Sequence, residues 1–213
     1  MVDGLHRVVI TGLGAVTPIG NTVQDYWHGL TSGRNGVEGI TLFDASKHAC
    51  RFAAEVKDFD TAGLIEPKEA KRWDRFCKFG VVAAKQAVAD AGLEITESNA
   101  ERIGTIIGSG VGGLLTMETQ AHVLDGKGPS RVSPFTVPMM IPNMATGLAA
   151  IALGTKGPSS AVATACAAGS NAIGDAFRLL QLGKADAMVC GGAESAITPL
   201  GCLLYTSPSP RDR

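Results

Sequence analysis

Three observations on the sequence predict an α/β fold. The chain has 213 residues of which 45% are hydrophobic, which is enough to bury the core of an ordinary globular unit. Short apolar runs at 102–107 and 187–190 each lead into glycine and are typical of buried strands. Segments with the apolar spacing of helices lie between these runs. Strands that alternate with helices favour a layered α/β arrangement.

The N-terminal part is predicted to contain a strand, a helix and a long loop. The β-branched run at 7–10 is typical of a short strand. Apolar side chains recur at helical spacing over 23–30, directly after an Asn-Thr pair that can supply the N-cap. The aromatic pair of this helix, Tyr26 and Trp27, is expected in the core. The following loop contains one expected strand, at 52–56.

A continuous helix is predicted over 67–91, where apolar residues recur at helical spacing until Gly92. Basic residues crowd its first turns, although the positive end of the helix dipole disfavours cations. They could form a solvated charged face, or they could meet an acidic partner. These residues are Lys68, Lys71, Arg72 and Arg75.

A glycine-rich turn follows the predicted strand at 102–107. Gly108, Gly110 and Gly113 have the spacing of a dinucleotide-binding fingerprint. Such a site also needs an acidic residue that closes a second strand about 20 residues later. Asp125 instead leads into an expected loop. The fingerprint therefore stands alone, and a nucleotide-binding module remains an alternative function.

Prolines exclude regular structure from 126–138, and a helix is predicted to resume over 139–153. Pro142 is compatible with this helix only in its first turn. Three methionines here are expected to fill core space rather than contact a substrate. They are Met139, Met140 and Met144.

The stretch 161–170 is the strongest candidate site. An apolar run ends at Cys166, among alanine, glycine and serine, and a helical pattern that continues to Gly183 begins at once. Unpaired N–H groups at a helix N-terminus favour a thiolate, and small neighbours allow a substrate to approach the sulfur. The alternative is a cysteine that only packs in the core of a non-enzymatic scaffold.

Several motifs together resemble the β-ketoacyl-[acyl carrier protein] synthases, most of all their type II members. The resemblance runs from about Leu5 to Gly201, in family order, and it includes the cysteine motif. It implies the thiolase-like layered αβαβα fold, of which this chain would form an incomplete N-terminal half. The motifs are Val9-Ile-Thr-Gly-Leu-Gly14, Gly108-Ser-Gly-Val-Gly-Gly113, Ser133-Pro-Phe135, Thr164-Ala-Cys166-Ala-Ala-Gly169 and Gly191-Gly-Ala-Glu194.

The resemblance also implies roles for individual residues. Cys166 would accept the acyl group in a decarboxylative condensation with malonyl-[acyl carrier protein]. Val111 would line the fatty-acyl pocket, and Phe135 would be either a pocket residue or packing. Lys71 and Arg72 would receive the acidic acyl carrier protein. No cofactor and no metal are expected, the full-length enzyme would be a homodimer, and a non-catalytic acyl-binding partner is the alternative within this family.

Charge, apolar runs and cysteine content indicate which partners and which cellular compartment to expect. The formal net charge is −1, which gives no sign of nucleic-acid binding, and no apolar run is long enough for a membrane span. The first residues lack the apolar region of a secretory signal. Five widely spaced cysteines indicate a reducing compartment and no metal site. We expect the protein to be located in the bacterial cytoplasm or in the plastid stroma.

The sequence departs from the family near its end. Residues 1–201 are expected to form the family domain, whereas 202–213 are expected to be a foreign or disordered tail. Two histidines and a lysine serve decarboxylation in the family, and no matching motif contains them here. This chain is therefore expected to carry only the acylation half and to be inactive in condensation by itself. The four histidines, His6, His28, His48 and His122, receive no catalytic role.

Overall fold

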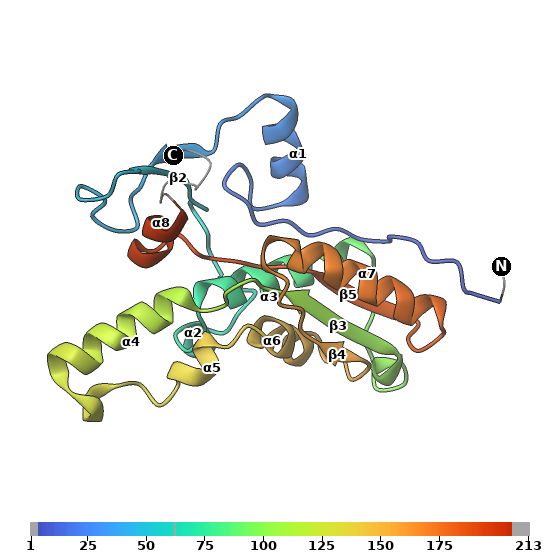
Figure 1. The fold of residues 1–213 in the computed structure, drawn as a ribbon. Helices are drawn as coiled ribbons and strands as arrows, with labels where there is room; N and C mark the ends of the chain where they lie inside the picture. Colours follow the sequence, from blue (N-terminus) through green and yellow to red (C-terminus); the bar gives the residue numbers. More distant parts are fainter. Residues whose placement is uncertain (1–3, 62, 206–213) are drawn as a thin grey trace.

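A computed structural model describes residues 4–61 and 63–205. Its centre is a three-stranded parallel sheet in the order β4-β3-β5 (Figure 1). The strands are β3 (Ile103–Gly108), β4 (Ser159–Ser160) and β5 (Ala187–Gly192). β3 pairs with β5 from Ile103 opposite Ala187, and every residue of β3 is buried. The predicted strands at 102–107 and 187–190 are thus confirmed.

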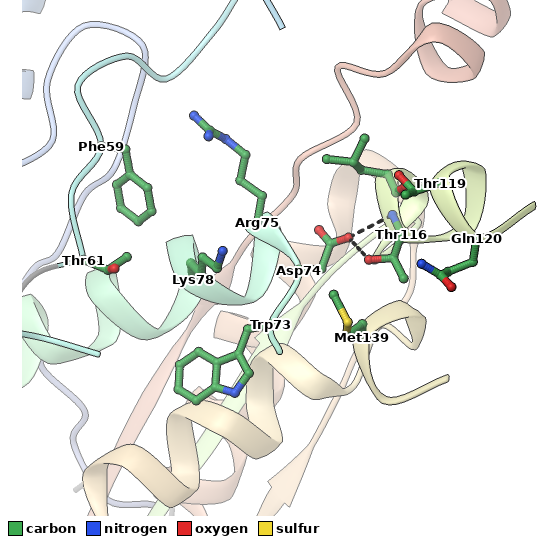
Figure 2. A pocket seen from close by; sticks show the side chains of 11 residues that line it. Phe59, Thr61, Trp73, Asp74, Arg75, Lys78, Thr116, Thr119, Gln120 and Met139 are labelled. Carbon is green, nitrogen blue, oxygen red and sulfur yellow. Dashed lines mark hydrogen bonds between the residues drawn. The ribbon is translucent and has the colours of Figure 1, made fainter. Parts of the chain in front are cut away.

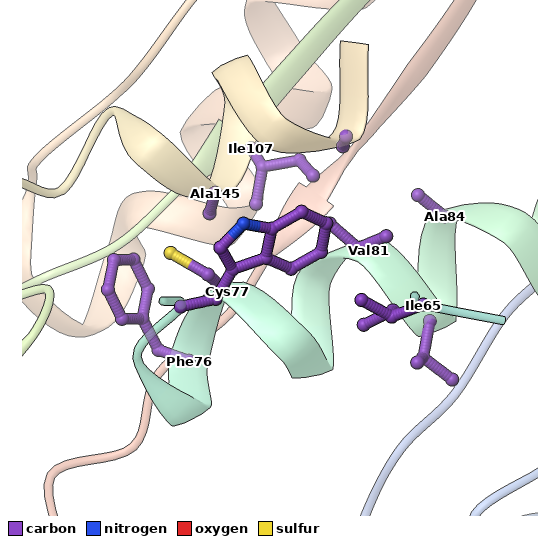
Figure 3. Close-up of a cluster of buried hydrophobic side chains, with 10 residues drawn as sticks. Ile65, Phe76, Cys77, Val81, Ala84, Ile107 and Ala145 are labelled. Atoms are coloured by element: carbon purple, nitrogen blue, oxygen red, sulfur yellow. The ribbon is translucent and has the colours of Figure 1, made fainter. Parts of the chain in front are cut away.

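Helices cover both faces of this sheet and make three layers. Helix α7 (Ala168–Gln181) packs against β3 and β5 on one face, and α3 (Arg75–Asp90) and α6 (Met144–Leu153) pack on the other. The main core lies between α3, α6 and the sheet (Figure 3). Phe76, Val81 and Ala145 are fully buried in it. An α/β fold with parallel strands is therefore confirmed.

The N-terminal part differs from the prediction. Residues 7–10 form no strand, and Ile10 is 81% exposed, because no neighbouring strand among the described residues pairs with this segment. Helix α1 (Val23–Thr31) forms with Thr22 as its N-cap, as expected. Trp27 is 66% exposed rather than in the core, since α1 packs through Gly29 against Ile19. Strands β1 (Val37–Gly39) and β2 (Phe52–Ala54) form an antiparallel pair.

The helix predicted over 67–91 is wrong as a continuous element. It divides into α2 (Pro67–Ala70) and α3, with a break at 71–74. Asp74 starts a new helix because its carboxylate accepts a hydrogen bond from the Phe76 N–H, at 3.3 Å, as an N-cap does.

The helix predicted over 139–153 also divides, at Pro142, into α5 (Thr136–Met140) and α6. The segment 126–138 is more regular than expected, because α4 (Leu114–Lys127) extends into it and Pro138 lies in the first turn of α5, where proline is tolerated. Together, α4 and α5 form an arm that projects from the sheet (Figure 1). The short 3₁₀ helices are η1 (Ala100–Arg102), η2 (Pro129–Arg131) and η3 (Ala165–Ala167).

The last described element is α8 (Pro199–Tyr205). It contains the first four residues of the expected tail at 202–213. The remaining residues of that tail, 206–213, lie outside the described residues.

Candidate active site

Cys166 lies on a tight turn at the N-terminus of α7. Residues 165–167 form η3, and α7 follows directly. Ala165 has a φ of 50°, a left-handed conformation that is unfavourable for a residue with a side chain. The Cys166 side chain is exposed. Backbone strain next to an exposed nucleophile is a feature of catalytic turns, so this geometry agrees with the predicted elbow.

Glycines let the first turn of α7 sit directly on the sheet. A β carbon at Gly108, the last residue of β3, would lie 2.3 Å from the Ala168 carbonyl oxygen. A β carbon at Gly192, the last residue of β5, would lie 2.8 Å from the Gly169 α carbon. Side chains at these points would push the helix away. Cys166 is consequently held at the carboxyl ends of parallel strands, where α/β proteins place their sites.

The turn also presents a backbone donor. Among the described residues, none accepts a hydrogen bond from the Cys166 N–H. A free N–H beside the sulfur can donate to the oxygen of an acyl group that the sulfur attacks. The helix dipole of α7 adds partial positive charge at the same place.

The other cysteines have different surroundings. Cys77 is fully buried in the core, and burial raises the pKa of its thiol far above the usual range. Burial also raises the pKa of Cys190. The residues that the structure describes hold no cluster of three or more His, Cys, Asp or Glu side chains that could bind a metal ion. Among the five cysteines, all of which the structure describes, Cys166 is the one that is exposed; Cys50 and Cys202 are partly buried.

The glycine-rich turn is already filled by protein groups. The Glu194 carboxylate accepts hydrogen bonds from the N–H groups of Gly110, at 2.8 Å, and Val111, at 2.9 Å. The Gly112 N–H donates to the Ser109 hydroxyl, at 3.1 Å, and the Gly113 N–H donates to the Met140 carbonyl, at 2.8 Å.

These four N–H groups are the ones that a pyrophosphate would need. The geometry therefore disfavours the dinucleotide alternative. Asp125, which the sequence placed in a loop, lies within α4 and closes no second strand. The Gly-Gly-Ala-Glu motif marks this position in the sequence, but the sequence alone predicts no contact between Glu194 and the turn.

Val111 lines a cavity of about 230 Å³ between the glycine-rich turn and α5. The lining is almost wholly apolar, which suits an acyl chain. Met140, expected only to fill the core, is one of the lining residues, whereas Met144 does pack against the main core. The other lining residues are Gly113, Leu114, Met117, Ile141 and Pro142.

Phe135 is not among the residues that line that cavity. The residue is 40% exposed, and its ring lies under the Arg72 guanidinium, whose carbon is 4.7 Å from the ring centroid. The structure thus brings Phe135, a predicted substrate-binding residue, into contact with Arg72, a predicted carrier-binding residue. Lys71 and Arg72 are both exposed. They lie between the four-residue helix α2 and Asp74, the N-cap of α3, so neither is in the first turn of a helix as the sequence predicted.

A second cavity, of about 400 Å³, lies between the start of α3 and α4 (Figure 2). Arg75 and Lys78 line it, and burial lowers the pKa of both side chains. Asp74 and Thr116 both line this cavity, and Figure 2 shows the Asp74 carboxylate pointing toward Thr116, whose hydroxyl donates a hydrogen bond to it. The sequence did not predict this cavity, because its only local sign is that the basic residues Arg75 and Lys78 are three positions apart and so lie on the same side of α3. No described helix is long and apolar enough to cross a lipid bilayer.

Curated relatives share this sequence over most of its length. The chain is 65% identical to 3-oxoacyl-[acyl-carrier-protein] synthase 2 of Synechocystis over 201 residues, which cover 94% of this chain and 48% of that protein. It is 52% identical to the synthase of the same name from Staphylococcus aureus strain COL, covering 94% of this chain and 49% of the relative. The chain therefore spans about half the length of these relatives.

Solved structures agree with these relatives. The ishigamide ketosynthase/chain length factor superposes with a TM-score of 0.86 at 28% identity, over 97% of this chain and 52% of that one. A type II polyketide ketosynthase, solved in complex with its acyl-carrier protein, superposes with a TM-score of 0.80 at 27% identity, over 93% and 53% of the two chains. The fold is thus that of the thiolase-like ketosynthases.

The sequence model of the β-ketoacyl synthase N-terminal domain matches residues 5–207, which contain the elbow at Cys166, the cavity at Val111 and the glycine-rich turn. By this match the chain belongs to the β-ketoacyl synthase family.

Proposed function

We propose that Cys166 accepts an acyl group as a thioester, as the first step of fatty-acid chain elongation. One observation carries the proposal: Cys166 is exposed on a strained turn at the N-terminus of α7, at the carboxyl ends of the parallel strands. The Cys166 thiol gives up its proton to solvent, and the resulting thiolate attacks the carbonyl carbon of an acyl thioester. A bond forms between that carbon and the Cys166 sulfur, the bond from the carbon to the carrier sulfur breaks, and the carrier leaves as a thiolate that takes up a proton.

In the complete enzyme the second step would be a condensation. Malonyl-carrier loses carbon dioxide, and the resulting carbanion attacks the carbonyl carbon of the acyl group on Cys166. The bond to sulfur then breaks and the Cys166 thiolate is released. The Cys166 N–H would stabilise the oxyanion in both steps.

Intact-protein mass spectrometry tests the first step. The chain is incubated with octanoyl-[acyl carrier protein], and the expected result is one added octanoyl group. Cys166→Ser is the matched control, and it should remain unmodified under the same conditions. An adduct of equal yield on Cys166→Ser would refute the assignment.

The cavity beside Val111 is proposed to hold the acyl chain. Val111→Phe should fill much of it, since the residue is 45% exposed and lines the space. Acylation by long-chain thioesters should then slow while acylation by acetyl thioester is retained. Val111→Ala is the control and should keep the long-chain rate. An unchanged chain-length profile in Val111→Phe would contradict this role.

The acyl carrier protein is the proposed partner at Lys71 and Arg72. Both cations are exposed, and a ketosynthase of similar fold was solved with its acyl-carrier protein. Reversing both charges to glutamate should raise the KM for carrier-bound substrate but leave a short free thioester unaffected. Reversal of the exposed Lys156 and Lys184 is the control, because these lie near the amino ends of β3 and β5. Equal effects on both substrates would refute the docking site.

A further inference from the structure

We infer that Glu194 is a positioning residue, which holds the glycine-rich turn in place beside Cys166 and thereby shapes the acyl-binding cavity. The inference rests on the proposed function, since it assigns a role in acyl acceptance. Glu194 follows β5, and the turn that it contacts follows β3. Its carboxylate thus joins two loops that are more than 80 residues apart in sequence.

The contacts of Glu194 are those of an anion in a ring of donors. One carboxylate oxygen, Oε2, accepts hydrogen bonds from two successive backbone N–H groups, those of Gly110 and Val111. The other oxygen, Oε1, accepts a hydrogen bond from the buried Ser109 hydroxyl, at 3.3 Å. Successive N–H groups that converge in a turn form an anion-binding concavity. Here the anion is a side chain of the protein.

No ion pair competes for this carboxylate. Within the described part of the chain, Glu194 forms no salt bridge with a lysine, arginine or histidine. Glu194 is itself exposed to solvent, and its charged carboxylate makes hydrogen bonds to the turn that are stronger than those of a neutral acceptor.

The turn also contacts the nucleophile elbow. A β carbon on Gly110 would lie 3.1 Å from Glu194 Oε2 and 3.3 Å from the backbone of Ala165. The Ser109 N–H donates to the Val162 carbonyl, at 3.0 Å, in the segment that leads to Cys166. Glu194, the turn and the elbow hence meet at Gly110, and a shift of the turn would move both a wall of the cavity and a neighbour of the sulfur.

Val111 connects this arrangement to chain-length selection. Its N–H is held by Glu194 while its side chain lines the apolar cavity. Removing the carboxylate frees that N–H, and the position of the Val111 side chain is no longer fixed. Long acyl chains, which need the cavity, should be affected more than acetyl groups, which do not.

Two variants separate this role from a general effect on stability. Glu194→Ala removes both oxygens. Glu194→Gln keeps one oxygen that can accept from both N–H groups, and its amide can donate to the Ser109 hydroxyl. Far-UV circular dichroism verifies that each variant is folded.

The first readout is amide hydrogen exchange over 109–113, which needs no acyl substrate. Glu194→Ala should exchange faster there than the wild type, Glu194→Gln should stay close to the wild type, and β3 should be unchanged in both. Exchange that is equally fast in Glu194→Ala and the wild type would overturn the inference.

The second readout is the ratio of octanoyl to acetyl transfer onto Cys166. We expect it to fall about tenfold in Glu194→Ala, because small misplacements of a binding wall cost rate steeply, and to recover in Glu194→Gln. An unchanged ratio would overturn the role in acyl selection. A wild-type chain that takes up neither group would instead refute the proposed function, and hydrogen exchange would still decide whether Glu194 holds the turn.

Discussion

Asp74 offers the sharpest test of how the arm is joined to the core. Asp74 is 4% exposed, and its carboxylate caps α3 through the Phe76 N–H. The carboxylate also accepts two hydrogen bonds from Thr116 of α4, from the N–H at 3.2 Å and from the hydroxyl at 2.5 Å. In Asp74→Ala the lost cap costs about 1 kcal/mol. Two buried donors of Thr116 lose their acceptor, at about 1 kcal/mol or more each. The expected loss of unfolding free energy is about 3 kcal/mol, or about 9 °C in Tm.

Urea unfolding followed by circular dichroism measures this loss, and Asp74→Asn is the matched control. Asparagine keeps one oxygen, which can replace Oδ2 and accept both hydrogen bonds from Thr116, while its amide group cannot accept from the Phe76 N–H. Asp74→Asn should therefore lose only the cap, about 1 kcal/mol, against about 3 kcal/mol in Asp74→Ala. A loss below about 1 kcal/mol in Asp74→Ala, within the ordinary range of surface substitutions, would refute the reasoning. So would equal losses in the two variants.

Three further predictions concern thiol reactivity, pH and packing. Iodoacetamide should modify Cys166 in the native chain but reach Cys77 only after unfolding, and equal rates by peptide mass spectrometry would contradict the assigned burial. Burial alone would raise the pKa of Glu55, but hydrogen bonds from Thr41 and Leu42 outweigh it and lower that pKa. The ionised Glu55 therefore stabilises the fold at pH values above its unfolded pKa of about 4.3, and this stabilisation is lost as the pH falls through the lower folded pKa. In Glu55→Gln, which cannot ionise, Tm should fall less steeply over the same pH range than in the wild type. Gly108→Ala should lower Tm by several degrees, because its β carbon would meet the Ala168 carbonyl oxygen at 2.3 Å; an unchanged Tm would show that α7 can move.

Local signals in the sequence predicted the centre of the fold. The mainly apolar run predicted as a strand at 102–107 corresponds to β3 (Ile103–Gly108), whose residues are all buried. Thr22 caps α1 because a threonine hydroxyl at that position satisfies a free N–H. The elbow at Cys166 was evident from small residues between an apolar run and a helical pattern. Each of these features depends on neighbours close in sequence.

Features that depend on distant neighbours could not be predicted in the same way. The break before Asp74 is stabilised by Thr116, which is 42 residues away. The strand expected at 7–10 had the right residue types but has no strand beside it among the described residues. The hydrogen bond from the Gly110 N–H to the Glu194 carboxylate joins two loops that are 84 residues apart in sequence, and the periodicity of apolar residues carries no information about such a contact.

Protection of Cys166 from alkylation tests the central claim most directly. The chain is first incubated with a saturated acyl thioester and then with iodoacetamide, and the modified peptides are identified by mass spectrometry. If Cys166 is the acyl acceptor, acylation should abolish its carbamidomethylation while the modification of Cys50, which is only partly buried, continues at its own rate. Undiminished carbamidomethylation of Cys166 after incubation with the thioester would contradict the claim.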